Sequence, residues 1–253
     1  MPRRIAIVLA STAVFLLVGF FTTIANAQDA KDRAANSAKS ANDALTEPKA
    51  ETRQRTLGIV LYPGFELLDV YGPAEMFGNV GQQMKIIMVA EQAGPVASNQ
   101  GPKTVADYGF DDCPPLDLIL VPGGFGTFQQ LGNARFHQWL NERASSAEMV
   151  TSVCSGSAIL AKAGLLDGRR ATSNKQFFGL ATKQGSKVEW VKEARWVDDG
   201  NRVTSSGVSA GMDMALAIIA RLYGQETAEG IANGTEYQWH RDADVDPFAK
   251  FAK

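Results

Sequence analysis

The fold of this chain is decided by one stretch, Met149-Val150-Thr151-Ser152-Val153-Cys154-Ser155-Gly156-Ser157-Ala158. Its first part is apolar enough for a buried β-strand, and the small residues after Cys154 suit a helix that begins at once. A cysteine at such a junction lies at the carboxyl edge of a sheet, where helix amides and the helix dipole lower the pKa of a thiol. The stretch therefore predicts a reactive Cys154. The alternative is a buried cysteine that packs as a small hydrophobe.

Strands and helices alternate on both sides of this junction. We expect buried strands at residues 57–62, 84–90, 116–121 and 149–153, and helices that start at Gly72-Pro73 and span 134–147 and 155–163. Short strands at 187–191, 194–197 and 202–204 follow, then a largely apolar helix at 209–223. This order predicts an α/β protein with a doubly wound, mostly parallel sheet and helices on both faces.

The first 27 residues have the order of a secretory signal peptide, with Arg3-Arg4, an apolar run to Ile24 and the small-residue site Ala25-Asn26-Ala27. We expect cleavage before Gln28 after general secretion and a periplasmic location, with membrane attachment only if the segment stays uncleaved. Residues 28–55 carry few large apolar side chains and predict a flexible tether. Residues 56–253 remain as one domain.

Charge and residue types exclude several functions. The net charge of −2 and the lack of a basic cluster argue against a nucleic-acid partner. Two histidines, His137 and His240, and two cysteines are scattered along the chain, so we expect no metal and no other cofactor. Both histidines are expected at the surface. Cys113 precedes its strand whereas Cys154 follows its own, which places the thiols roughly 15–20 Å apart and excludes a disulfide.

Two carboxylates and one glycine turn are candidates to work with the thiol. Asp69 follows the first strand and is expected at the same sheet edge as Cys154, although it could simply cap the next helix. Glu75 is the runner-up acid, with a surface role at the helix dipole as its simpler interpretation. The Gly123-Gly124 turn lacks the spacing of a phosphate-binding loop. Its N–H groups can stabilise negative charge if the turn faces Cys154.

Several motifs together resemble the ThiJ/PfpI family, whose fold is flavodoxin-like and similar to class I glutamine amidotransferases. They are Leu68 to Pro73, Pro122 to Gly124, the strand-Cys154-helix junction, Ala163 to Thr172, Arg195 to Gly200 and Ser206 to Asp213. The resemblance implies that Cys154 is a nucleophile on a strained elbow and that Gly124 and Ser155 contribute backbone N–H groups to an oxyanion-type pocket. It also implies that Asp69 is an acid that faces the thiol, as in isonitrile hydratases. One departure is Asn174, which stands where family members often carry a histidine.

By this resemblance we expect an exported, cysteine-dependent lyase that adds water to a small isonitrile substrate and yields an N-substituted formamide. The family also implies a homodimer. A glyoxalase or deglycase that acts on reactive aldehydes is the first alternative, and Asn174 weakens it because that chemistry usually needs a second base. The other alternative is a non-catalytic module that binds a ligand or senses oxidation, since an accessible thiolate oxidises readily.

Overall fold

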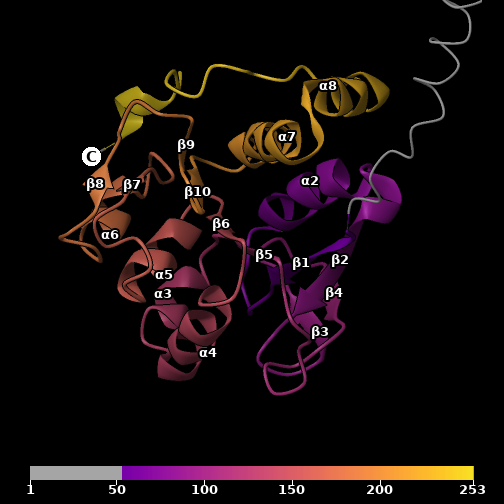
Figure 1. Cartoon of the computed structure of the whole chain (residues 1–253). Coiled ribbons are helices and arrows are strands. Elements are labelled where there is room, and N and C mark those ends of the chain that lie inside the picture. Colours follow the sequence, from indigo (N-terminus) through magenta and orange to yellow (C-terminus); the bar gives the residue numbers. More distant parts are fainter. Residues whose placement is uncertain (1–52, 253) are drawn as a thin grey trace, which may run out of the picture. The chain divides into compact units, whose positions relative to one another are not determined.

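A six-stranded sheet forms the centre of the computed structural model, which describes residues 53–252. Figure 1 shows its strands, in the order β2-β1-β5-β6-β10-β9. Their bounds are Arg55–Val60 (β1), Met84–Val89 (β2), Leu118–Val121 (β5), Met149–Ser152 (β6), Trp196–Asp199 (β9) and Arg202–Ser205 (β10). All neighbouring strands pair in parallel except β9 and β10, which form an antiparallel hairpin. The predicted doubly wound, mostly parallel sheet is confirmed.

Helices cover the two faces of this sheet. Figure 1 shows α2 (Leu67–Gly78), α7 (Ala210–Tyr223) and α8 (Gln225–Gly234) on one side. On the other side lie α3 (Thr127–Gln130), α4 (Ala134–Ala144) and α5 (Gly156–Lys162), with α6 (Phe178–Thr182) nearby. Short elements complete the fold: β3 (Gly94–Ala97), β4 (Lys103–Ala106), β7 (Arg170–Ala171), β8 (Glu189–Trp190) and the 3-10 turns Gly81–Gln83 and Ala249–Phe251.

The central strands are buried on both faces, which explains why they read as continuous apolar runs rather than as alternating patterns. All four residues of β5 and of β6 are buried. On α4 the side chains of Phe136, Trp139 and Leu140 form a buried apolar stripe. None of the helices within residues 53–252 is long and apolar enough to cross a membrane.

Several boundaries differ from the sequence prediction, most clearly at three places. Helix α2 begins at Leu67 rather than at Gly72, so Pro73 lies inside the helix. A proline there has no N–H to donate to the carbonyl four residues earlier, and burial of Val70 and Phe77 keeps the helix continuous. The strand expected at 187–191 shrinks to β8. Strand β1 begins at Arg55, inside the expected tether, while the predicted signal peptide and residues 28–52 lie outside the described residues.

Candidate active site

Cys154 lies on a sharp elbow between β6 and α5. Its φ of 59° is in the left-handed region that only glycine adopts without cost, so the backbone is strained at this residue. The Cys154 N–H donates to the Ser206 carbonyl at 2.9 Å. A side chain at Gly156 would collide with the carbonyl oxygens of Val121 and Pro122, which explains the glycine two residues after the thiol. The elbow has the form that the family resemblance implies.

Asp69 is fully buried in the first turn of α2, beside the elbow. One carboxyl oxygen, Oδ2, accepts the N–H of Gly123 at 2.7 Å, while Oδ1 has no hydrogen-bond partner within residues 53–252. The cap position of α2 is Glu66, so the interpretation of Asp69 as a helix cap is wrong. Burial raises the pKa of Asp69 to about 8. The carboxyl is therefore mostly protonated at neutral pH, and its unpartnered oxygen can exchange a proton.

Burial also raises the pKa of the Cys154 thiol, which is the reverse of the expectation from the helix N-terminus. The negative charge of Asp69 raises this pKa further, whereas the N–H groups of Ser155 and Val208 and the Asn174 amide lower it. The effect of burial on the pKa of Cys154 is larger than the effect of these donors, because a buried thiolate loses its hydration. Cys154 and Asp69 are close enough to shift each other's pKa, so they titrate as a coupled pair.

The backbone N–H groups of the Gly123-Gly124 turn are hydrogen-bonded to side chains and are not free to bind a substrate. The N–H of Gly123 is bonded to Asp69, and the N–H of Gly124 donates to Ser155 Oγ at 3.2 Å. The Ser155 hydroxyl also contacts Thr127 Oγ1 at 3.0 Å. Gly124 and Ser155 both line the pocket with Cys154, as expected, but the Gly124 amide is directed at a hydroxyl. Ser155 therefore offers the site both its N–H, toward the sulfur, and a positioned hydroxyl.

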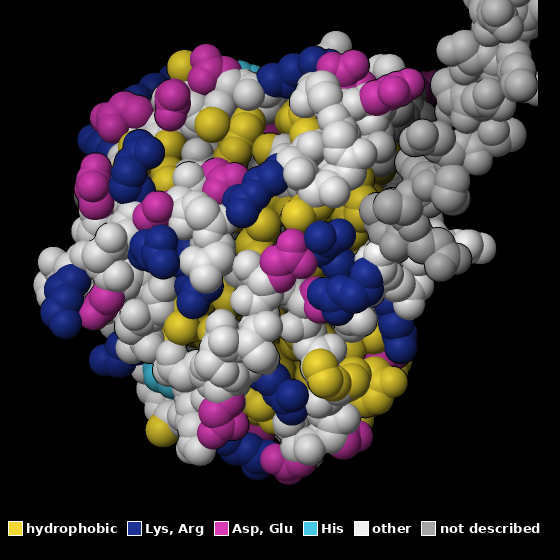
Figure 2. Space-filling model, viewed as in Figure 1, with side chains coloured by type: hydrophobic (Ala, Val, Ile, Leu, Met, Phe, Trp, Pro, Cys, Tyr) yellow, Lys and Arg dark blue, Asp and Glu magenta, His cyan; other side chains and the backbone are white. Residues whose placement is uncertain are grey.

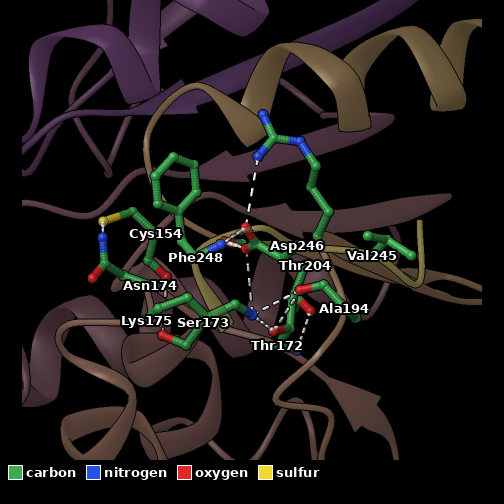
Figure 3. A network of polar contacts seen from close by, with 12 residues as sticks. Cys154, Thr172, Ser173, Asn174, Lys175, Ala194, Thr204, Val245, Asp246 and Phe248 are labelled. Atoms are coloured by element: carbon green, nitrogen blue, oxygen red, sulfur yellow. Dashed lines mark hydrogen bonds and ion pairs between the residues drawn. The ribbon is translucent and has the colours of Figure 1, made fainter. Parts of the chain in front are cut away.

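Asn174 is a residue of the site that the sequence revealed only as the absence of a histidine. Its Nδ2 donates to Cys154 Sγ at 3.1 Å (Figure 3). Its Oδ1 accepts the N–H groups of Gln176 and Phe177 at 2.9 and 3.2 Å. Because these two bonds occupy the oxygen, the amide must present its donor to the sulfur. An amide donates without accepting a proton, so Asn174 stabilises a thiolate but cannot act as a base.

A cavity of about 170 Å³ opens next to the thiol. Aromatic side chains dominate its apolar wall, and Phe177 packs edge-on against Phe125 and Phe128 at centroid distances of 5.9 and 6.3 Å. The other lining residues are Glu66, Gly124, Cys154, Ser155, Asn174, Gln176, Leu180 and Val208. Asp69 lies beside the sulfur and not on the cavity surface. The arrangement suits a small substrate with an apolar substituent whose reacting atom meets the thiol.

Other candidate residues lie away from this cavity. Glu75 is exposed on α2, where it accepts a hydrogen bond from Asn79, so the runner-up acid is not part of the site. His137 and His240 are half-buried rather than fully exposed, and neither lines the cavity. Cys113 is a free thiol, as is Cys154. Within residues 53–252 no three His, Cys, Asp or Glu side chains gather in a way that could hold a metal ion.

The site combines a cysteine elbow on a doubly wound sheet with a buried carboxyl next to the sulfur. The chain belongs to the DJ-1/PfpI family, whose sequence pattern matches residues 55–221. This confirms the resemblance to the ThiJ/PfpI proteins.

Relatives in the family have different activities. The chain is 35% identical to an isonitrile hydratase from Pseudomonas putida over 181 residues, which are 72% of this chain and 78% of that protein. It is 30% identical to the HTH-type transcriptional regulator CdhR of Pseudomonas aeruginosa over 141 residues, 56% of this chain and 41% of the regulator. The crystal structure of a ThiJ/PfpI family protein from Pseudomonas syringae superposes with a TM-score of 0.68 at 36% identity and covers 79% of both chains.

Proposed function

We propose that the protein is a cysteine-dependent hydratase that converts isonitriles to N-substituted formamides. The observation that carries the proposal is the buried pair of Cys154 and Asp69, which can move a proton at neutral pH without a histidine. The similarity to an isonitrile hydratase supports the same chemistry. An isonitrile carbon needs a nucleophile and then a proton, and this pair supplies both.

In the proposed reaction, the Cys154 sulfur attacks the terminal carbon of the isonitrile and forms a C–S bond. Asp69 gives its proton to that carbon and takes up the proton that the thiol loses, and the product is a thioimidate. Water then adds to the C=N bond: its oxygen bonds to the carbon, and Asp69 gives its proton to the nitrogen while it takes one from the water. The C–S bond breaks as the proton of the added hydroxyl returns to the sulfur through Asp69, and the formamide leaves with Cys154 and Asp69 restored. One water molecule is consumed in each cycle.

Three groups around the sulfur support the first step. The Asn174 amide and the Ser155 N–H stabilise the thiolate as it forms. A protonated Asp69 removes the repulsion that a carboxylate would exert on a thiolate. The aromatic wall of Phe125, Phe128 and Phe177 binds the apolar substituent of the substrate.

The test is a screen of the purified protein against isonitriles, nitriles and 2-oxoaldehydes, with Cys154→Ala as the control. Formamide produced from an isonitrile, and lost in the control, supports the proposal. Turnover of 2-oxoaldehydes alone would instead identify a glyoxalase or deglycase. No turnover, together with peroxide-dependent oxidation of Cys154, would identify an oxidation sensor and overturn the hydratase.

A further inference from the structure

The C-terminal strap, which we define as residues 237–252, lies beyond the residues that match the family. It is tied to the chain just before β9. The Ala243 carbonyl accepts the N–H of Arg195 at 2.7 Å, and the Asp246 N–H donates to the Glu193 carbonyl at 2.9 Å. The side chain of Asp246 has no solvent exposure, and Figure 3 shows it facing Lys175. The strap thus carries a carboxylate into the interior.

Asp246 meets two buried cations there. Lys175 Nζ lies 3.7 Å from its Oδ2, and Arg195 lies 3.9 Å from its Oδ1. Arg195 already has a closer carboxylate, because Asp213 pairs with it at 2.6 Å. Asp246 is therefore the principal counter-charge of Lys175, whose side chain is only 3% exposed. A buried charge that loses its partner is strongly destabilising, so the position of Lys175 depends on the strap.

Two contacts of Asp246 lead to the thiol. Lys175 directly follows Asn174, and its Nζ donates to Thr172 Oγ1 at 2.8 Å and to the Ala194 carbonyl at 2.7 Å. These bonds fix the segment that presents the Asn174 amide to the sulfur. Asp246 also accepts the hydroxyl proton of Ser206, the residue whose carbonyl binds the Cys154 N–H. One carboxylate thus holds both the sulfur's donor and the backbone of the cysteine.

We propose that Asp246 is a positioning residue for Cys154, and that the C-terminal strap fixes the thiol and its Asn174 donor through Lys175 and Ser206. This role goes beyond the proposed hydratase activity, because it sets the reactivity of the thiol toward any electrophile. It also gives the strap a function that the family-matched residues do not include.

The test is the rate of iodoacetamide alkylation of Cys154 in the full chain as a function of pH, followed by peptide mass spectrometry. Asp246→Asn keeps the shape of the side chain and removes its charge. We expect its alkylation profile to move to higher pH, with a rate at pH 8 that is lower by about tenfold if the loosened donor costs one pKa unit. Asp244→Asn, an exposed strap residue, is the matched control and should match the wild type.

A double variant shows whether Asp246 acts through Asn174. Asn174→Ala should produce an upward shift of the same kind, and Asp246→Asn should then add only the smaller shift that comes through Ser206. A folded Asp246→Asn variant with the wild-type profile would overturn the proposal, as would a full-sized shift that persists on top of Asn174→Ala.

A milder variant covers the case in which Asp246→Asn does not fold. Ser206→Ala keeps both buried charges and the carbonyl that binds Cys154, so we expect a smaller shift in the same direction. An unchanged profile for Ser206→Ala would then count against the proposal. Isonitrile turnover is a separate measurement, because its absence in the wild type would refute the hydratase while the alkylation result still decides the role of Asp246.

Discussion

The chemistry of the site at the residue scale rests on the proton that Asp69 holds. A helix N-terminus alone predicts a thiol with a lowered pKa, yet burial raises the pKa values of both Cys154 and Asp69. The carboxyl retains its proton near neutrality because its own pKa is about 8. Ionised Asp69 opposes formation of the Cys154 thiolate, whereas neutral Asp69 can donate a proton.

Removal of the carboxylate should make the thiol more reactive toward an alkylating agent. In Asp69→Asn the charge that raises the pKa of Cys154 is gone, so we expect faster alkylation, most of all above pH 8 where Asp69 ionises. Relief of one pKa unit corresponds to about a tenfold higher rate. Iodoacetamide kinetics at pH 9 measure this effect. Glu75→Gln removes an exposed carboxylate of the same helix and should change nothing.

The raised pKa of Asp69 also predicts how stability depends on pH. Between about pH 4, where an unfolded aspartate ionises, and the folded pKa of about 8, the unfolded state releases a proton that the folded state keeps. Wild-type stability should therefore fall across this window by at most about 1.4 kcal/mol per pH unit.

The Asp69→Asn variant does not lose stability in this way as the pH rises, and its amide oxygen can still accept the N–H of Gly123. Its melting temperature should exceed that of the wild type by a margin that grows from pH 5 to pH 8. Melting curves that stay parallel over this range would show that Asp69 is not held protonated by burial.

At the scale of elements, the sequence was most informative where strand and helix patterns are strong. The apolar run before Cys154 and the small residues after it predicted β6, the elbow and α5, and Asp69 was placed correctly at the same sheet edge. Pro73 misled the prediction of the start of α2, because proline is commonest in a first turn and here lies inside the helix.

The remaining details depend on tertiary contacts. The direction of the Gly124 amide depends on a hydroxyl from another loop, and the pKa of the thiol depends on how completely the fold encloses it. Neither can be read from local sequence. The Asn174 donor could have been found from its position in the usual histidine place, since an amide there also faces the sulfur.

The close backbone packing at the Cys154 elbow can be tested by adding one methyl group at Gly156. Gly156→Ala would place a carbon 2.7 Å from the Pro122 carbonyl oxygen and even closer to that of Val121. Both are backbone atoms, one at the end of β5 and one in the turn after it, so we expect a loss of stability of about 2 kcal/mol or more, within the range of overpacked cores. Gly230→Ala, in α8 with no atom within 4 Å of the added carbon, should instead stabilise the protein slightly. Urea denaturation compares the two variants.

At the scale of the whole molecule, charged side chains are spread over the surface, whereas some large apolar side chains are exposed together on two elements. Figure 2 shows lysine, arginine, aspartate and glutamate side chains interspersed over the visible face. Large apolar side chains are exposed on α2 and β4, with Leu68 at 41%, Tyr71 at 44% and Val105 at 63%. The Tyr71 hydroxyl contacts Thr104 at 2.9 Å, which connects α2 to β4. These residues form an apolar surface on β4 and on α2, the helix that carries Asp69.

We propose that this surface is the contact of a homodimer. Leu68→Glu and Val105→Glu should then shift the protein from dimer to monomer in light scattering at micromolar concentration, because a buried charge opposes association. Val245→Glu, at an exposed apolar residue of the strap, is the control and should leave the mass unchanged. A wild-type protein of monomer mass would contradict the proposal.

The account as a whole depends on whether Asp69 moves the proton that the thiol chemistry needs. The most direct measurement is kcat/KM for isonitrile hydration by the wild type and by Asp69→Asn, with Glu75→Gln as the matched carboxylate control. We predict that Asp69→Asn loses about a hundredfold or more of the activity, because Asn can neither donate nor retrieve a proton, while Glu75→Gln keeps it. Near-normal turnover by Asp69→Asn would contradict the proposed mechanism.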